Sequence, residues 1–199
     1  MSEPLFQSLD SAAIANDIRK AQHSVCYAAP GIQRDPANAM AELARRLDPE
    51  FITVCLDFDE RVMRMGFGEL AAVKTLRDAG IVVNSTSGLR TGLVIVDHQG
   101  YIFTPTALYL EAEARPADAP NAMRLSKDQV TEALARLSPA AKAIAIAFAK
   151  TEEERKHIRE QAVEVPSTKV IDEEFAAVDT VITVKVFLIG FWMKRLPLA

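Results

Sequence analysis

The chain has 199 residues, of which 49% are hydrophobic and 25% charged, and its net charge is -4 at pH 7. These proportions are typical of an ordinary globular protein, and the length is enough to bury a sizeable core. The acidic balance creates no overall basic field, so it gives no support for nucleic acid or an anionic membrane surface as a partner.

Cysteine usage and the N-terminal sequence bear on the compartment. Cys26 and Cys55 both lie in apolar runs, where a free cysteine behaves as a small hydrophobe, and two cysteines do not form a disulfide framework. The first residues lack the charged segment and apolar run of a secretory signal. We therefore expect a cytoplasmic protein.

Helical and strand patterns alternate through the first half of the chain. Apolar residues at helical spacing predict amphipathic helices, and the short apolar runs between them predict buried strands. Ser8 or Asp10 can cap the first helix, and Gly80 can end the third. This alternation predicts an α/β fold with parallel strands joined by helical crossovers. The expected elements are a helix at 8–22, a strand at 23–28, a helix at 36–47, a strand at 51–56, a helix at 68–79 and a strand at 81–83.

A hairpin follows these elements. Its first strand, residues 93–96, is apolar and ends in Asp97, and residues 98–100 form the turn. The second strand covers residues 101–103. Together with the preceding elements, the hairpin predicts an α/β domain over residues 1–115.

The order of these elements and the hairpin resemble the phospholipase D-like fold over about residues 8–110. Proteins of that family carry their chemistry on a strand that reads His-x-Lys-x4-Asp and is followed by a Gly-Ser turn. In this chain Asp97 takes the place of the family aspartate, Arg90 that of the histidine and Gly92 that of the lysine. The resemblance implies the family's sheet with flanking helices, but with a degenerate motif.

The substitutions remove the groups that the family's reaction needs. Phospholipase D chemistry uses an imidazole to attack phosphorus and a lysine to hold the phosphoryl oxygens. Arg90 is a poor nucleophile because it stays protonated at ordinary pH, and Gly92 carries no charge. We therefore predict no catalytic residue, and a non-catalytic phospholipase D-like module that serves binding or assembly.

Arg90 can still take part in binding. A guanidinium binds phosphate or carboxylate through two parallel hydrogen bonds, and α/β folds place ligands at the carboxyl end of the sheet. Alternatively, Arg90 pairs with Asp97 or Asp57 and only stabilises the end of the sheet. The predicted ligand-binding residues are Arg90, Asp97, Thr104 and Thr106, and the two threonines stand near the place of the family's Gly-Ser turn.

A metal-dependent enzyme is the alternative function. The strand at 51–56 is followed by Asp57 and Asp59, a pattern that resembles the magnesium-binding strand of haloacid-dehalogenase-like phosphatases. Such an enzyme would transfer phosphoryl groups with these carboxylates, or with a rearranged site at Asp97 and His98. However, acidic residues at strand ends also form helix caps, and His98 fits a turn residue that faces solvent. The preferred prediction therefore includes no metal and no other cofactor.

The second half of the chain predicts a helical extension. A proline-containing breaker at 116–120 separates the first domain from a second one, expected at residues 116–199. A helix is predicted at 126–136 with Ser126 as its N-cap, and another at 139–161. The charged half of the latter is expected to be solvated, because acidic and basic residues alternate in it.

The last apolar segment, residues 181–193, predicts a buried or pairing strand. Its apolar residues alternate, and the segment is too short and, with Lys185, too polar for a membrane span. An exposed hydrophobic strand would aggregate, so cover must come from the preceding helices or from another copy of the chain. Since single-motif proteins of the resembled family often pair face to face, we expect a homo-oligomer, and by the same analogy a protein partner.

Overall fold

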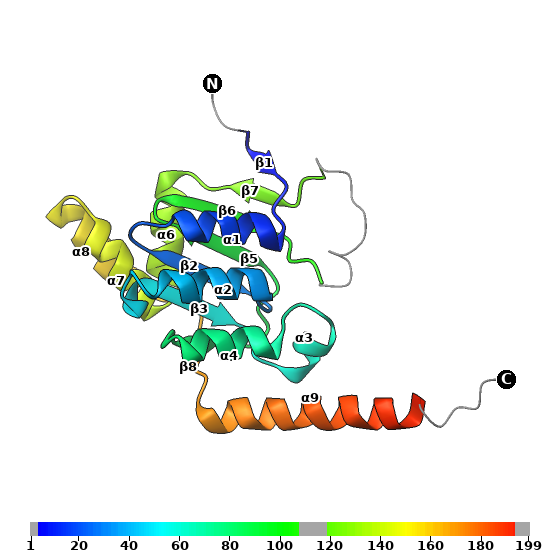
Figure 1. The fold of residues 1–199 in the computed structure, drawn as a ribbon. Helices are drawn as coiled ribbons and strands as arrows, with labels where there is room; N and C mark the ends of the chain where they lie inside the picture. Colours follow the sequence, from blue (N-terminus) through cyan, green and yellow to red (C-terminus); the bar gives the residue numbers. More distant parts are fainter. Residues whose placement is uncertain (1–3, 108–118, 194–199) are drawn as a thin grey trace.

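The computed structural model of the chain describes residues 4–107 and 119–193, including their side chains except those of residues 183–193. Figure 1 shows the arrangement of the elements. The strands are β1 (Phe6–Gln7), β2 (Val25–Ala29), β3 (Ile52–Leu56), β4 (Val83–Ser85), β5 (Gly92–Val96), β6 (Gln99–Phe103), β7 (Ala122–Arg124) and β8 (Thr168–Lys169). The α-helices are α1 (Ser11–Lys20), α2 (Arg34–Leu43), α3 (Glu60–Arg64), α4 (Leu70–Asp78), α6 (Lys127–Leu137), α7 (Pro139–Phe148), α8 (Glu152–Glu160) and α9 (Asp172–Met193), and a short 3-10 helix spans Pro49–Phe51.

One mixed sheet organises the part of the chain that the structure describes. Its strand order is β1-β7-β6-β5-β2-β3-β4-β8. The neighbours β2, β3 and β4 are parallel, whereas β5 and β6 form an antiparallel hairpin beside β2. The predicted α/β fold, with a parallel set of strands and a hairpin after it, is confirmed.

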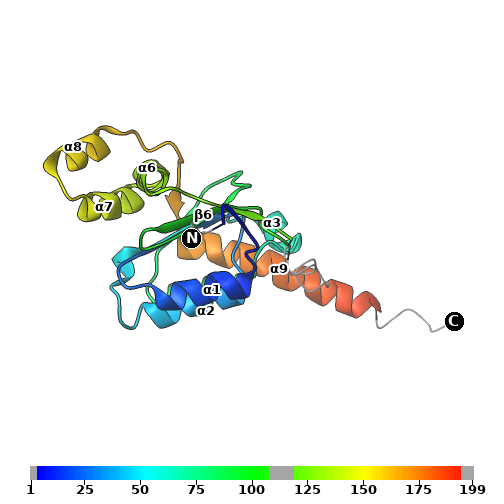
Figure 2. The same cartoon turned by 90° about the horizontal axis from the view of Figure 1, so that it is seen from above.

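Helices cover the sheet on both faces (Figure 2). α1, α2 and α4 lie on one face, where Ile18, Met40 and Leu76 belong to one apolar cluster. α6, α7 and α8 lie on the other face, where Leu134 and Ile144 belong to a second cluster. Every residue of β2 and β3 is buried between these layers, as expected for apolar strands covered on both sides.

Capping residues explain where several helices begin and end. The Asp10 carboxylate accepts a hydrogen bond from the backbone N–H of Ala13 (2.7 Å) and caps α1. Ser126 caps α6 in a capping box with Gln129. Gly80 follows α4 with a φ of 79°, a left-handed conformation that glycine adopts without steric cost. All three residues were predicted for these roles.

The single helix predicted at 139–161 is wrong, because the chain forms two helices, α7 and α8, that contact each other. α8 begins at a capping box: Thr151 accepts from the backbone N–H of Glu154 (3.1 Å), and the Glu154 carboxylate accepts from the backbone N–H of Thr151 (3.2 Å). The Lys142 ammonium of α7 donates to the carbonyl oxygen of Gln161 at the end of α8. These contacts define the break and hold the two helices together.

The predicted C-terminal strand at 181–193 is also wrong, because this segment belongs to helix α9. Three acidic residues lie in the first turn of α9, where their negative charges interact favourably with the positive end of the helix dipole. The carboxylate of one of them, Glu174, accepts a hydrogen bond from the backbone N–H of Ile171 (3.3 Å). Helix initiation upstream therefore decides the conformation of an apolar segment whose alternation alone favours a strand.

The first half of α9 is fixed to the body of the protein by an aromatic contact. The Phe175 ring stacks on that of Phe58, with centroids 6.1 Å apart, and the Arg77 guanidinium lies 4.7 Å from the Phe175 centroid. The second half runs beyond the body in both ribbon views (Figures 1 and 2). Within the described residues, no helix has the length and apolar character needed to cross a membrane.

The two predicted domains share the same sheet. Residues after 115 add β7 beside β6 and β8 beside β4. They also supply α6, α7 and α8, which cover strands of the first half. The parts of the chain before and after residue 115 therefore contribute strands to one sheet and side chains to the second apolar cluster.

A close backbone contact shapes the carboxyl end of β2. A Cβ atom on Gly31 would lie 2.5 Å from the carbonyl oxygen of Phe67, and one on Gly68 would lie 2.8 Å from the nitrogen of Ile32. The backbone N–H of Glu69 also donates to the carbonyl oxygen of Ile32 (3.0 Å). The loop after β2 is thus held against the loop between α3 and α4, and only glycine fits at the crossing.

The substitution Gly31→Ala is expected to lower the free energy of unfolding by about 1–3 kcal/mol, because the added methyl group must displace backbone atoms. Gly68→Ala should have a similar effect, and the double variant should lose less than the sum, since either change opens the same contact. Urea unfolding measures all three variants. A Gly31→Ala protein as stable as the wild type would show that the two loops do not need this contact.

Candidate functional site at the carboxyl edge of the sheet

An ion pair between Asp57 and Arg90 lies at the carboxyl edge of the parallel strands. Asp57 directly follows β3 and its side chain is 7% exposed, whereas that of Arg90, in the loop before β5, is 67% exposed. The Arg90 Nη1 group donates to the Asp57 carboxylate and to the carbonyl oxygen of Leu89 (2.9 Å). Among the residues that the structure describes, no acceptor is bonded to Nε or Nη2 of Arg90. Part of the guanidinium is therefore available to a ligand.

Two buried polar residues lie at the same edge. The backbone N–H of Thr86, directly after β4, donates to the carbonyl oxygen of Leu56 (2.6 Å). Gln33, in the loop after β2, donates from Nε2 to the carbonyl oxygen of Gly66 (3.1 Å). The Thr86 hydroxyl oxygen and the Gln33 Oε1 are buried and have no protein partner within the described residues. Such atoms are uncommon in folded proteins and indicate a place for water or a ligand.

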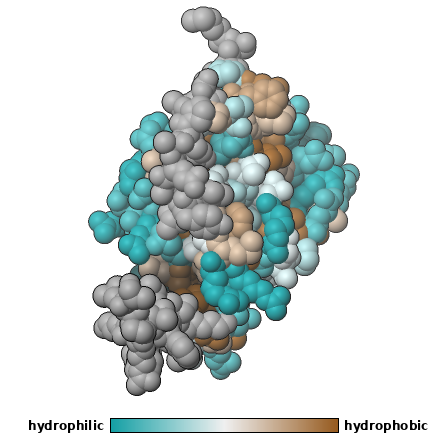
Figure 3. All heavy atoms as spheres, turned by 90° about the vertical axis from the view of Figure 1, so that its right-hand side faces the viewer, coloured by the Kyte–Doolittle hydropathy of each residue, from teal (hydrophilic) through white to brown (hydrophobic). Residues whose placement is uncertain are grey.

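Sequence analysis did not identify Thr86 or Gln33. The only signal was that each follows an expected strand, where polar residues are common. Figure 3 shows the molecule from this edge, where hydrophilic residues cover most of the coloured surface and smaller hydrophobic areas lie between them. The part of this edge that is coloured in Figure 3 is therefore mostly polar.

Thr104 and Thr106 lie at the same edge but farther along it. They follow β6, and the strand order places β5 and β2 between β6 and β3. With neighbouring strands about 4.8 Å apart, the end of β6 is roughly 14 Å from that of β3. The backbone N–H of Thr104 donates to the carbonyl oxygen of Asn121 (2.8 Å). Both threonines therefore lie on one side of the ion pair and too far from it for direct contact.

Asp97 lies at the opposite edge of the sheet. β5 runs antiparallel to β2, and Val96 pairs with Val25 at the start of β2. The 5 residues of β5, at about 3.3 Å each, separate the level of Asp97 from that of Arg90 by roughly 16 Å. The structure brings Arg90 to Asp57 and not to Asp97, so the four predicted ligand-binding residues do not form one site.

Asp97 instead fastens the hairpin to the start of β2. It has a φ of 54°, a conformation that aspartate adopts more readily than most residues. Its carboxylate accepts hydrogen bonds from the backbone N–H groups of Gln22 (3.0 Å), His23 (2.8 Å) and Ser24 (3.0 Å). Partial burial acts to raise the pKa of Asp97, but the amides of Ser24, Gln22 and His23 together hold that pKa below its usual value. This carboxylate is therefore occupied by the backbone.

His98 does not form a catalytic site with Asp97. Its side chain is exposed in the hairpin turn, and its ring meets that of Phe148 edge-on, with centroids 5.2 Å apart. His23 contacts the same phenyl ring at 6.0 Å. The two histidines therefore border the end of α7, while backbone amides hold the neighbouring carboxylate.

Asp59 acts as a helix cap. Its carboxylate accepts from the backbone N–H of Arg61 (2.7 Å) at the start of α3, a short helix that the sequence analysis missed. In residues 4–107 and 119–193, no group of three or more His, Cys, Asp or Glu side chains is placed to hold a metal ion. The two carboxylates of the alternative magnesium site thus have other partners, Arg90 for Asp57 and the α3 backbone for Asp59.

The two cysteines are poor candidates for a nucleophile. Both are free and buried on the neighbouring strands β2 and β3. Burial raises the pKa of Cys55 to about 11, against a smaller opposing effect of a hydrogen bond with Ser138. Burial, and then the neighbouring Cys55, raise the pKa of Cys26 well above its usual value. Since the thiolate is the reactive form, both groups remain inert thiols.

Comparison with known proteins identifies no family for this chain: no family model matches it, and no curated protein or solved structure is significantly similar to it. Its function is therefore inferred from the residues and the geometry of the site.

The ion pair predicts an asymmetric response to mutation. Arg90→Ala should lower the free energy of unfolding by about 1–3 kcal/mol, because the buried Asp57 carboxylate loses its partner. In an Asp57→Asn background the same substitution should cost less than about 0.5 kcal/mol, since no buried charge remains. Denaturant unfolding of the four proteins in this double-mutant cycle gives the coupling. Equal costs in the two backgrounds would contradict a stabilising role for the pair.

The contacts of Asp97 predict a pH-dependent contribution to stability. At neutral pH, Asp97→Asn should lower the free energy of unfolding by about 1–3 kcal/mol, because a neutral amide replaces a carboxylate that accepts backbone hydrogen bonds. The pKa of Asp97 is depressed in the folded chain, so this contribution is fully present above the unfolded pKa of about 3.9 and is lost as the pH falls through the folded pKa.

The difference in stability between wild type and Asp97→Asn should therefore shrink below about pH 4. Unfolding by denaturant over the acid range measures it. Asp128→Asn, an exposed residue in the first turn of α6, is the control and should differ little from the wild type. A difference that stays constant down to the most acid pH would show that the charge of Asp97 does not matter.

Proposed function

We propose that this chain is a non-catalytic phospholipase D-like module that binds an oxyanion at the carboxyl edge of its sheet. The observation that carries this proposal is the exposed Arg90 guanidinium, held in place by a buried carboxylate. Arg90 stands where the resembled family has its catalytic histidine, at the end of the sheet where α/β folds place ligands. A phosphate or carboxylate would accept hydrogen bonds from Nε and Nη2.

Asp57 limits the strength of this binding. Its carboxylate offsets part of the charge of Arg90, so a single anion in water binds weakly and reversibly. The Thr86 hydroxyl at the end of β4 has no protein partner within the described residues, but it is buried, so the exposed guanidinium is the main donor to the ligand. Thr104 and Thr106 would contact only a ligand that extends along the edge, and Asp97 is too far away to contribute.

The positions of the histidines support a non-catalytic role. All three lie away from the carboxyl edge: His23 and His98 are at the amino edge and His157 is on α8. Arg90 cannot replace an imidazole as the nucleophile. A metal-dependent phosphoryl-transfer enzyme has less support, because Asp57 and Asp59 are engaged with Arg90 and with α3.

An exposed apolar row supports a role in assembly. Phe6 of β1, Met123 of β7 and Ile102 of β6 occupy paired positions on three neighbouring strands and are all exposed. Paired positions point to the same face of a sheet, so these side chains form one apolar surface. We propose that a second copy of the chain covers it, in keeping with the homodimer that the resemblance implies.

The oxyanion site predicts that phosphate stabilises the protein through Arg90. At ten times its Kd, phosphate should raise the free energy of unfolding of the wild type by about 1.4 kcal/mol. Thermal melting at constant ionic strength should show no such rise for Arg90→Ala. Arg45→Ala, at an exposed arginine just beyond α2, is the matched control and should keep the response.

Two results would contradict this site. An equal response of the wild type and Arg90→Ala would remove the anion-binding role of Arg90. Stabilisation by magnesium that is lost in Asp57→Asn would favour the metal-dependent enzyme instead.

Light scattering tests the proposed assembly. The wild type should be a dimer, and Met123→Asp should be a monomer because the charge disrupts the apolar surface. A monomeric wild type would contradict the proposed assembly.

A further inference from the structure

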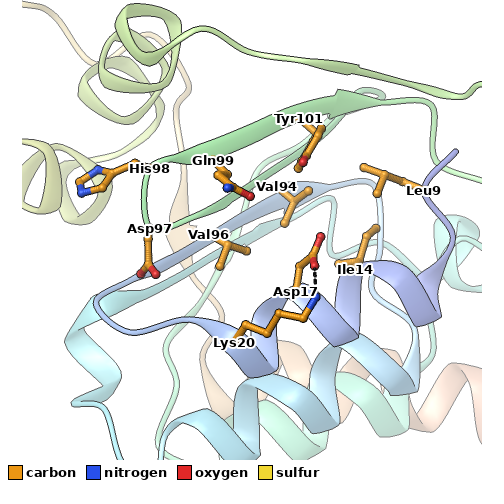
Figure 4. A pocket seen from close by; sticks show the side chains of 10 residues that line it. All are labelled: Leu9, Ile14, Asp17, Lys20, Val94, Val96, Asp97, His98, Gln99 and Tyr101. Atoms are coloured by element: carbon orange, nitrogen blue, oxygen red, sulfur yellow. Dashed lines mark hydrogen bonds and ion pairs between the residues drawn. The ribbon is translucent and has the colours of Figure 1, made fainter. Parts of the chain in front are cut away.

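A hollow of about 340 Å³ lies between α1 and the β5–β6 hairpin, on the face of the sheet opposite to α6 (Figure 4). The sheet continues past β5 to β6 and β7, whereas α1 packs against β5. Among the described residues, no further helix follows α1 on this face (Figure 2). The hollow is therefore a consequence of a sheet that is wider than its helical cover.

The base and one wall of the hollow are apolar. Val94 and Val96 of β5 form the base, Ile14 of α1 forms part of the wall and Leu9 closes one end. Leu9, Ile14 and Val94 belong to the buried core, so their positions are set by packing and not by a ligand. Val94 is only 3% exposed, so a flat apolar group on this base would meet mainly the half-buried Val96.

Polar side chains complete the wall and the mouth. Asp17, one turn after Ile14 on α1, forms an ion pair with Lys20 (3.0 Å), which Figure 4 shows as a dashed line. The side chain of Asp17 is 38% exposed and that of Lys20 is 64% exposed. Asp17 is therefore the more firmly placed partner, and Lys20 can turn into solvent at little cost, as is typical of surface pairs.

The charges around the hollow favour a cation. Burial, and after it the charge of Asp17, raise the pKa of the Tyr101 hydroxyl on the opposite side above its usual value. A hydrogen bond with the Gln7 side chain acts in the opposite direction. Asp97, at the hairpin end, is a second carboxylate of the lining, and its oxygens already accept hydrogen bonds from backbone N–H groups. Against these two charges stands the single ammonium of Lys20.

We propose that this hollow binds a small molecule with a flat apolar body and one primary ammonium group, such as an arylalkylamine. The apolar body lies on Val94 and Val96. The ammonium replaces Lys20 as the partner of the Asp17 carboxylate. This site is separate from the carboxyl edge, so it does not depend on the oxyanion site there.

Phenethylamine is the probe, and phenylacetate, with the same ring and the opposite charge, is its matched control. Two-dimensional amide NMR should show saturable shifts around the hollow with phenethylamine and none with phenylacetate. Asp17→Asn should weaken the binding of phenethylamine at least about tenfold, because a charge-assisted hydrogen bond is lost. Lys20→Met should strengthen it about two- to fivefold, since no ammonium competes for Asp17. Asp128→Asn on α6 should change nothing.

Val96→Phe tests the apolar part of the site, because the larger ring fills the hollow and should abolish binding while thermal melting confirms the fold. The proposal is overturned by the absence of saturable shifts with phenethylamine, by equal binding of phenylacetate, or by unchanged affinity in Asp17→Asn. If Asp17→Asn does not fold, Lys20→Met tests the site instead, because the Lys20 side chain lies mostly in solvent and its replacement should not disturb the fold. Weaker binding of phenethylamine by that variant would contradict the site.

Discussion

Burial of β2 and β3 on both faces is the constraint on which the rest of the structure depends. Every residue of these strands is buried, so helices from both halves of the chain must cover them. Only the strand ends reach solvent. Polar chemistry along these strands is therefore confined to the two edges of the sheet, where Asp57 and Arg90 lie at one and Asp97 at the other.

The two edges hold their carboxylates in different ways. Three backbone amides hold Asp97, and the fold fixes their positions. Asp57 is held by the side chain of Arg90, which lies mostly in solvent and keeps Nε and Nη2 available to another acceptor. A ligand at the carboxyl edge can therefore share the partner of a carboxylate, whereas an anion at the amino edge would have to compete with the main chain.

The sequence predicted the α/β core because continuous apolar runs, caps and alternation all agreed there. It failed where one local signal opposed a longer pattern. Thr151 begins a new helix within a charged segment that looks like a continuation of the helix before it. The alternating apolar residues of 181–193 favoured a strand, although the segment continues a helix that begins upstream. The choice of Asp57 or Asp97 as the partner of Arg90 depends on the direction of β5 in the sheet, a non-local property that no residue spacing determines.

Both outer strands of the sheet, β1 and β8, are only 2 residues long. A long outer strand offers a row of unpaired N–H and C=O groups on which another chain can build a continuous intermolecular sheet. Here that row is short on both sides of the sheet. The longer strands β6 and β3 are each third from an outer strand and have a neighbouring strand on both sides. The association proposed at Phe6 and Met123 would therefore proceed through side chains, without templating open-ended fibrils by strand addition.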